Sequence, residues 1–195
     1  NAQRGHPLGG ERGGIDTYHT YGRFWGMTTK PQILDAALDV LRDGRSLTID
    51  AVAQEAKLTK PGVVHHFPTK EALAFAVLEH LLARWERELS ERAGADASPE
   101  QRLRAYAELA LLGEMDTADL ALFADPRLRE KLSVRWGEQM DAWFGSLEHP
   151  RAAAVRYLAD GAWIDRCLGI LPQDRDQRAA VLDVALSLFE KETDA

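Results

Sequence analysis

The sequence of 195 residues is long enough for one large domain or two small ones, and its 45% hydrophobic and 28% charged residues are an ordinary balance for a globular protein. It shows no apolar stretch that could cross a bilayer and no secretion signal, and its single cysteine, Cys167, excludes an internal disulfide and a metal site built from cysteines, so we expect a cytoplasmic protein. The net charge of −7 is uneven, because residues 1–26 and 27–70 each carry +1 and residues 71–195 therefore carry −9, which disfavours contact between this last part and a phosphate backbone.

Residues 1–26 differ from the rest of the chain. They hold seven of the 15 glycines and follow neither a helical nor a strand period. We expect this segment to be a flexible N-terminal extension and Met27 to be the natural start of the protein.

Three short helices are predicted between Thr29 and Phe67. The first begins at Thr29, and apolar residues at the spacing of one helix face support it; these are Leu34, Ala37, Leu38 and Leu41. Gly44 ends this helix. The second helix begins at Thr48 and turns Ile49, Val52, Ala53 and Ala56 inward. After a turn at Lys57–Leu58, the third helix begins near Thr59 and ends by Phe67.

The rest of the chain also predicts helices. Thr69 caps a long fourth helix that extends to about Arg92. Prolines at the first helical position mark three later starts, which are Ser98-Pro99, Asp125-Pro126 and His149-Pro150, and the last helix covers about residues 174–191. No segment alternates apolar and polar residues as a strand does, so we expect an all-α fold of roughly nine helices.

One stretch, from Thr48 to Leu73, carries the functional motif. Its main elements follow one another at continuous spacing: Val52-Ala53, Thr59-Lys60, His66-Phe67 and Pro68-Thr69-Lys70-Glu71-Ala72-Leu73. Over about residues 31–80 the sequence resembles the N-terminal domain of the TetR family of bacterial transcriptional regulators, whereas the C-terminal two-thirds resembles the family only in the number and lengths of its helices. The resemblance implies a helix-turn-helix DNA-binding domain over residues 27–72, and a larger helical ligand-binding and dimerisation domain over residues 73–195.

The helix-turn-helix is expected from Thr48 to Phe67, with the third helix in the major groove of DNA. Val63 and Phe67 are four residues apart and can face inward, which leaves the other side of the helix for DNA. The expected DNA-binding residues are Thr48, Thr59, Lys60, Pro61, Gly62, Val64, His65 and Lys70. The sequence departs from the family pattern at Pro61, where glycine is common, and at Val64-His65, where the family often has a tyrosine.

A small-molecule site is implied by the family resemblance, as a cavity between the helices of the C-terminal part. Large aromatic and methionine side chains there favour an apolar or aromatic effector. The candidate ligand contacts are Trp85, Tyr106, Met115, Phe123, Trp136, Met140, Trp143 and Trp163, and for each of them the alternative is an ordinary core residue. Four carboxylates could receive a cationic ligand, although solvated surface groups are the simpler interpretation; these are Glu114, Asp116, Asp160 and Asp165.

A homodimer is expected through the last two helices, at about residues 150–169 and 174–191, because in the family these form a four-helix bundle between subunits. Their apolar residues are Val155, Leu158, Ala162, Val181, Ala185, Leu188 and Phe189. Dimerisation also has a physical reason, since one short recognition helix reads too few bases to define a specific site. Asp160 and Arg166 are a candidate ion pair across or within this bundle.

The expected function is a sequence-specific transcriptional regulator, a repressor released by a small molecule, that binds double-stranded operator DNA and not a membrane. We expect no cofactor and no metal, because His65 and His66 point about 100° apart on a helix and no third ligand is evident. We expect no enzymatic activity, since the sequence has no P-loop, no G-x-S-x-G elbow and no H-E-x-x-H motif.

Two alternatives to this interpretation stay open. The first is a helical small-molecule-binding or interaction protein without specific DNA binding. The second concerns residues 1–26, which could form an arm that reaches a DNA groove through Arg4, Arg12 and Arg23.

Overall fold

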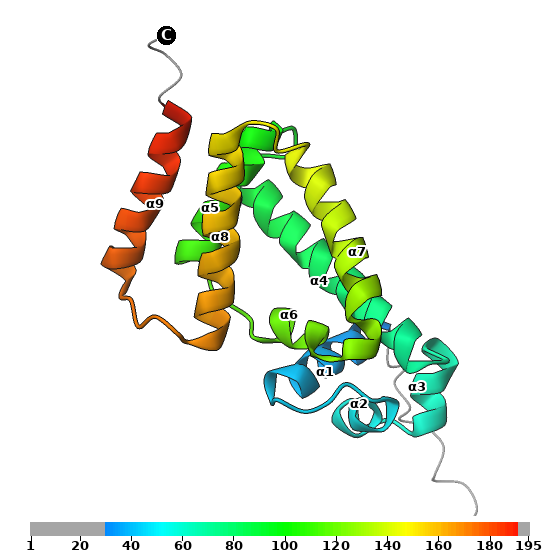
Figure 1. Cartoon of the computed structure of the whole chain (residues 1–195). Coiled ribbons are helices and arrows are strands. Elements are labelled where there is room, and N and C mark those ends of the chain that lie inside the picture. The colour runs from blue at the N-terminus through cyan, green and yellow to red at the C-terminus, as the bar shows by residue number, and fades with distance from the viewer. Residues whose placement is uncertain (1–29, 191–195) are drawn as a thin grey trace, which may run out of the picture.

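The computed structural model describes residues 30–190, and the extension 1–26, Met27 and the helix start at Thr29 lie outside these residues. Within them every regular element is a helix, which confirms the all-α prediction (Figure 1). The first helices are α1 (Lys30–Arg42), α2 (Ile49–Glu55), α3 (Lys60–His66), α4 (Lys70–Ala93) and α5 (Pro99–Leu112). They are followed by α6 (Ala118–Ala121), a single 3₁₀ turn (Leu122–Ala124), α7 (Pro126–Phe144), α8 (Pro150–Leu168) and α9 (Arg175–Glu190).

Side-chain caps start the helices where the sequence predicts them. The hydroxyls of Thr48, Thr59 and Thr69 each accept a hydrogen bond from the backbone N–H three residues later, at 3.1, 3.3 and 3.0 Å. Ser98 and Gln101 form a reciprocal capping box at the start of α5. The short helix α6 was not predicted, because four residues are too few to show a helical period.

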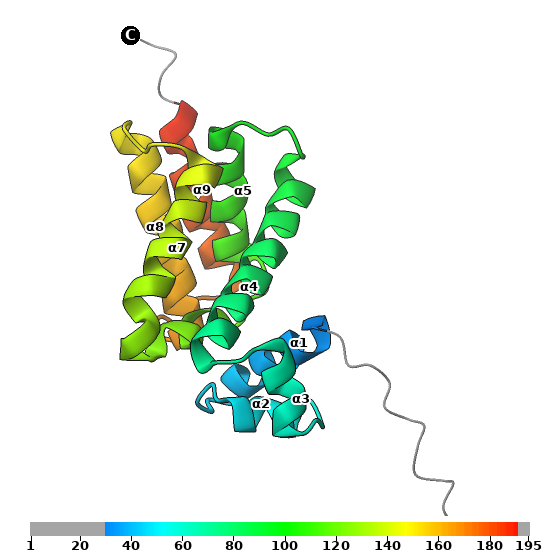
Figure 2. The ribbon, with the colours of Figure 1, turned by 90° about the vertical axis from the view of Figure 1, so that its right-hand side faces the viewer.

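Helices α1, α2 and α3 form a small unit at one end of the molecule, which we call the head (Figure 2). Val52 of α2 and Val63 of α3 are fully buried, and Phe67 belongs to the same hydrophobic core. The chain turns between α2 and α3 at Lys57, whose φ of 55° places a non-glycine residue in the left-handed region. This is the turn that the sequence predicts at Lys57–Leu58.

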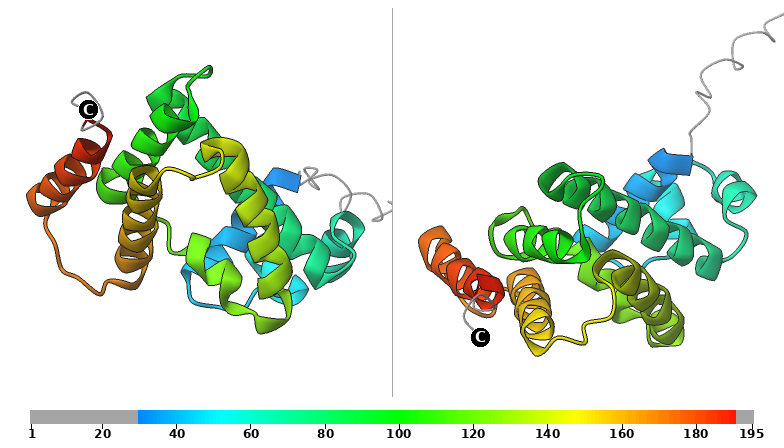
Figure 3. Two further views of the ribbon diagram at one scale, coloured as in Figure 1. Left: turned by 45° about the horizontal axis from the view of Figure 1, so that its top comes forward. Right: turned by 90° about the horizontal axis from the view of Figure 1, so that it is seen from above.

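The remaining helices, α4 to α9, form the body. Helix α4 begins beside the head and extends into the body, so the predicted domain boundary at residue 72 falls inside its first turn (Figures 1 and 2). Helix α5 packs against α4, α7, α8 and α9 and lies at the centre of the body. Viewed from above, α8 and α9 lie side by side at the edge of the body away from α3 (Figure 3). No helix in residues 30–190 combines the length and apolar character needed to cross a membrane.

Aromatic side chains fill the interior of the body between α4, α5, α7 and α8. The rings of Trp136 and Trp163 stack with their centroids 5.6 Å apart and their planes 9° apart, and both lie edge-on to Trp85 at 6.4 Å. Tyr106 and Phe123 continue this cluster through contacts with Trp85 and Trp136. The packed rings therefore occupy space that was expected to be a ligand cavity.

Candidate functional site

The exposed face of α3 is the candidate DNA-binding surface. Val63 and Phe67 point into the head and are buried, as their spacing predicts. Pro61, Val64 and His65 are exposed on the other side of the helix. The structure thus presents these three residues together on one short helix at the end of the molecule (Figure 2).

Gly62 lies on the first turn of α3, where its missing side chain is not required by the fold. A Cβ atom built there would lie 3.4 Å from the Thr59 hydroxyl oxygen, an ordinary contact, and no positive φ holds the position. A small residue here therefore leaves room outside the protein, which suits close approach of a DNA backbone.

Lys60 stands at the start of α3 and forms an ion pair with Asp50 of α2 at 2.9 Å. Both side chains are more than half exposed, at 59% and 69%. Such a pair contributes little to stability, about 0–1 kcal/mol, so Lys60 can exchange Asp50 for a phosphate at small cost.

Lys70 is placed differently from the other candidate DNA contacts. Its amine is 2.5 Å from Asp125, the residue that caps α7, so in this structure it links the start of α4 to the body. The predicted phosphate contact of Lys70 would require this pair to open, and it stays a prediction.

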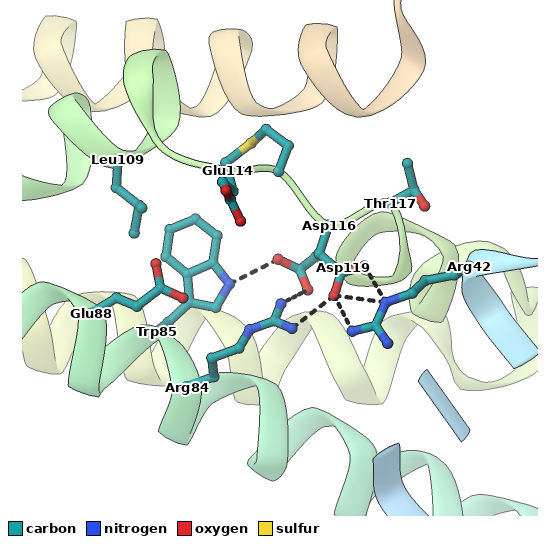
Figure 4. Close-up of a pocket in the computed structure, with 10 residues that line it drawn as sticks. Arg42, Arg84, Trp85, Glu88, Leu109, Glu114, Asp116, Thr117 and Asp119 are labelled. Atoms are coloured by element: carbon teal, nitrogen blue, oxygen red, sulfur yellow. Dashed lines mark hydrogen bonds and ion pairs between the residues drawn. The ribbon is translucent and has the colours of Figure 1, made fainter. Parts of the chain in front are cut away.

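A pocket of about 550 Å³ lies where the head meets the body (Figure 4). Its wall combines α1, α4, the end of α5 and the segment leading into α6. The lining residues are Arg42, Arg84, Trp85, Glu88, Leu109, Glu114, Met115, Asp116, Thr117 and Asp119. Of the eight predicted ligand contacts, this pocket includes Trp85 and Met115.

The other six predicted ligand contacts do not line this pocket. Tyr106, Met140, Trp143 and Trp163 are buried, and Phe123 and Trp136 are partly buried against the same core. The alternative interpretation of them as core residues describes their position here, because the aromatic rings pack on one another. Their role as ligand contacts stays a prediction.

A chain of ion pairs crosses the pocket. Arg42 of α1 donates through Nε and Nη2 to both carboxylate oxygens of Asp116, at 2.5 to 3.1 Å. Arg84 of α4 donates to the same carboxylate at 2.7 Å and to Asp119 of α6 at 2.6 Å. The indole N–H of Trp85 donates to Asp119 at 3.0 Å.

This network corrects the expectation that Asp116 is a solvated surface carboxylate. Its side chain is only 16% exposed and also accepts the backbone N–H of Ala118. Arg42, Arg84 and Asp119 were not predicted as site residues, because the network joins residues as far as 74 positions apart. The one local signal is the Asp116-x-x-Asp119 spacing before an apolar run, which is typical of a helix start.

The pKa values of two carboxyl groups in the network are shifted in opposite directions. Burial disfavours the charged form of Asp116, but hydrogen bonds from Arg42, Ala118 and Arg84 outweigh it and lower its pKa to about 2. Burial dominates at Asp119, which is 2% exposed, and raises its pKa to about 6 although Arg84 and Trp85 favour the carboxylate. Asp119 is therefore the group of this site that changes charge nearest to neutral pH.

The stability of the fold should depend on pH through Asp119. Its pKa is higher in the folded state than in the unfolded chain, so this group adds stability as pH falls from 7 towards 4. Between pH 7 and pH 5 the gain is about 1 kcal/mol, while Asp116 stays ionised. We expect the unfolding free energy of the wild type, measured with urea, to rise over this interval relative to Asp119→Asn. A difference between the two proteins that does not change with pH would contradict the assignment.

Glu88 and Glu114 complete the polar wall of the pocket. Figure 4 shows both carboxylates beside the ring of Trp85. Among residues 30–190 the carboxylate of Glu114 has no ion-pair or hydrogen-bond partner, and the carboxylate of Glu88 has only a distant pair with Arg92 at 3.8 Å. With Arg42 and Arg84 already paired to aspartates, these two glutamates leave the pocket with an excess of negative charge next to the apolar surface of Leu109 and Met115.

The ion pair expected between Asp160 and Arg166 does not form within the protomer. Asp160 pairs with Arg156 at 2.7 Å and accepts a hydrogen bond from the hydroxyl of Tyr106 at 2.6 Å, and a pair with Arg166 across a dimer stays a prediction. Arg166 instead donates to two backbone carbonyls at the end of α5. Cys167 is half-buried against the core, and burial raises the pKa of its thiol to about 11.

The outer faces of α8 and α9 carry an apolar surface that the sequence analysis did not identify. Of the residues named for the dimer, Val155 and Ala185 are fully buried within the protomer, and Leu158, Ala162, Val181, Leu188 and Phe189 pack against the same core. Val155 and Ala185 are therefore not available to a second copy, whereas a part of the other five residues in a dimer stays a prediction. A separate exposed stripe consists of Tyr157, Ile164 and Leu168 of α8 together with Val184 of α9.

Two family models match the chain. The model described as bacterial regulatory proteins, tetR family, matches residues 33–77, which span most of the head and the start of α4. The model described as the tetracyclin repressor-like C-terminal domain matches residues 100–189, which span α5 to α9. A comparison with curated proteins finds no match.

Solved structures share the fold. A protein from Streptomyces coelicolor A3(2) assigned as a transcriptional regulator is 21% identical, with a TM-score of 0.60 over 83% of this chain and 98% of that chain. One from Pseudomonas aeruginosa PAO1 is 16% identical, with a TM-score of 0.60 over 83% and 90%. The multidrug binding protein EbrR, solved with ethidium, is 23% identical, with a TM-score of 0.52 over 80% and 96%. At these identities the likeness concerns the fold.

Proposed function

The chain belongs to the TetR family of transcriptional regulators and is a DNA-binding regulator, and we propose that it acts as a dimeric repressor that leaves its operator when a cation with aromatic or apolar groups binds the acidic pocket. The observation that carries the proposal is the position of this pocket, whose wall includes α1 of the head and α4 and α6 of the body. A ligand there contacts both parts of the molecule.

The DNA-binding part of the proposal rests on the face of α3. Pro61, Val64 and His65 are exposed there, and Gly62 leaves space for a close approach. The charge distribution also supports DNA contact through the head, since residues 71–195 carry −9 and would be repelled by phosphates. We propose that the major groove receives α3, with Thr48, Thr59 and Lys60 on phosphates at the starts of α2 and α3.

The DNA-binding part of the proposal is tested by measuring binding of the protein to the DNA upstream of its own gene. The measurement uses fluorescence anisotropy at two salt concentrations. We expect specific binding that weakens steeply with salt, because phosphate contacts release counterions. Lys60→Ala should weaken binding and reduce the slope of log K against log salt by about 1. The matched control is Lys131→Ala, an exposed α7 residue paired with Glu71, which should leave the slope unchanged. Absence of sequence-specific binding by the wild type would rule out the proposal.

The effector class follows from the chemistry of the pocket. Glu88 and Glu114 attract a cation, and Trp85, Leu109 and Met115 provide apolar contact for the rest of the molecule. The similar protein EbrR was solved with ethidium, which is a planar aromatic cation. The predicted apolar or aromatic effector is thereby refined to one that also carries positive charge.

Dimerisation through α8 and α9 is part of the same proposal. The exposed stripe of Tyr157, Ile164, Leu168 and Val184 lies on neighbouring helices, and Gly161 in the middle of α8 permits close approach of a second helix. A second copy of the chain would cover this stripe and set two α3 helices at a fixed spacing.

A further inference from the structure

The ion pair between Arg42 and Asp116 joins the DNA-binding head directly to the wall of the pocket. Arg42 is the last residue of α1, and Asp116 lies in the segment that connects α5 to α6. Helix α1 packs against α2, α4 and α6, so its end touches the head on one side and the body on the other. A ligand that binds the carboxylate of Asp116 therefore acts on this junction between the head and the body.

The carboxylate of Asp116 is already fully occupied by hydrogen-bond donors. It accepts hydrogen bonds from Arg42, Arg84 and the backbone N–H of Ala118. A cationic group that enters the pocket and approaches Asp116 must therefore replace one of the two arginines.

Arg42 is the arginine that an entering cation can replace. Arg84 is 26% exposed and is held by a second, buried carboxylate, Asp119. Arg42 is 39% exposed, and its other partner, Asp39, is on its own helix at 2.6 Å. Arg42 can consequently leave Asp116 and keep one ion pair, whereas Arg84 would leave a buried charge without its partner.

We propose that the effector and Arg42 compete for Asp116, so that effector binding frees the end of α1 from the body. This inference rests on the proposed function, and it identifies the contact through which the pocket controls the head. The remaining links of the head and α4 to the body, such as Lys70 to Asp125, do not line this pocket's wall and stay in place. The head then shifts relative to the body about these remaining contacts, and the spacing between the two α3 helices of the dimer changes.

Competition between the effector and Arg42 has two linked consequences for the variant Arg42→Ala. Without the competing guanidinium, Asp116 is more available, so a cation should bind the variant about tenfold more tightly than the wild type, equivalent to 1.4 kcal/mol. Because coupling is reciprocal, the same variant should lose the effect of the cation on operator affinity.

The test uses the full-length dimer, labelled operator DNA and tetraphenylphosphonium, an aromatic cation that is too bulky to intercalate into DNA. The operator dissociation constant is measured with and without saturating cation. We expect the cation to raise it about tenfold or more in the wild type, and to leave it nearly unchanged in Arg42→Ala. The neutral analogue triphenylphosphine oxide should have no effect on either protein.

Arg45→Ala is the matched control, since it removes the same charge from the head. Arg45 pairs with Glu55 inside the head at 2.7 Å and does not line the pocket. Arg45→Ala should therefore respond to the cation as the wild type does. If Arg42→Ala also keeps the wild-type response, the competition is wrong while the proposed function stands. If the wild type itself does not respond, the aromatic-cation effector of the proposed function fails together with this inference.

Discussion

Replacing Ile164 by glutamate is expected to separate the dimer and to weaken operator binding about 100-fold or more. Ile164 lies in the exposed apolar stripe of α8, one turn from Gly161 and from Leu168. A carboxylate at this position would lose its water in the dimer, which costs several kcal/mol. A single head then binds one half-site without the gain of about 10²–10⁴ in affinity that linkage of two sites provides.

The oligomeric state of Ile164→Glu can be measured by size-exclusion chromatography with light scattering, and its operator affinity by anisotropy. The control is Val134→Glu, which introduces the same group at an exposed apolar position of α7, outside the apolar stripe of α8 and α9. This control should stay dimeric with wild-type affinity. A variant of Ile164 that remains dimeric would show that α8 does not form the interface.

Replacing Glu88 and Glu114 together by glutamine is expected to weaken binding of an aromatic cation about tenfold or more. The two carboxylates flank Trp85 and are not neutralised by the arginines of the pocket. Glutamine keeps their size and polarity and removes both charges, so the loss measures the electrostatic attraction. A change of 1.4 kcal/mol corresponds to one factor of ten.

Titration calorimetry with tetraphenylphosphonium measures this effect on the protein without DNA. Glu138→Gln on the exposed face of α7 is the control, because it changes charge away from the pocket and should leave the affinity unaltered. Equal affinity of the double variant and the wild type would mean that the cation binds elsewhere.

Local features of the fold were predictable because their causes are local. Thr48, Thr59 and Thr69 start helices through hydrogen bonds that span three residues, and the prolines at positions 99, 126 and 150 start helices by fixing one backbone angle. The burial of Val63 follows from the same short-range periodicity. The head could therefore be predicted closely, and the resemblance of its sequence to a known family added the function.

The pocket could not be predicted, because its parts come together only in the folded chain. Arg42 and Asp116 are 74 residues apart, and nothing in either neighbourhood indicates the other. The aromatic residues were expected around a ligand, but Trp136 and Trp163 stack on each other in the interior of the body. The pocket proposed for the effector lies closer to the head, and charged side chains form much of its wall.

The proposed dimer surface on α8 illustrates a different ambiguity. Helix α8 has apolar residues on two faces: Val155, Ala159 and Trp163 are buried in the protomer, and Tyr157, Ile164 and Leu168 are exposed. Spacing shows that both faces are apolar, but it does not show which of them the protomer buries. The structure resolves this point, since α5 covers the inner face.

In the proposed mechanism, occupation of the acidic pocket releases operator DNA from α3. The most direct test is to titrate tetraphenylphosphonium into the complex of the wild-type dimer with labelled operator and to monitor DNA release by anisotropy. We expect the DNA to be released over the range of cation concentrations that saturates the free protein, and triphenylphosphine oxide to release none. Saturation of the pocket by the cation while the DNA stays bound would contradict the claim.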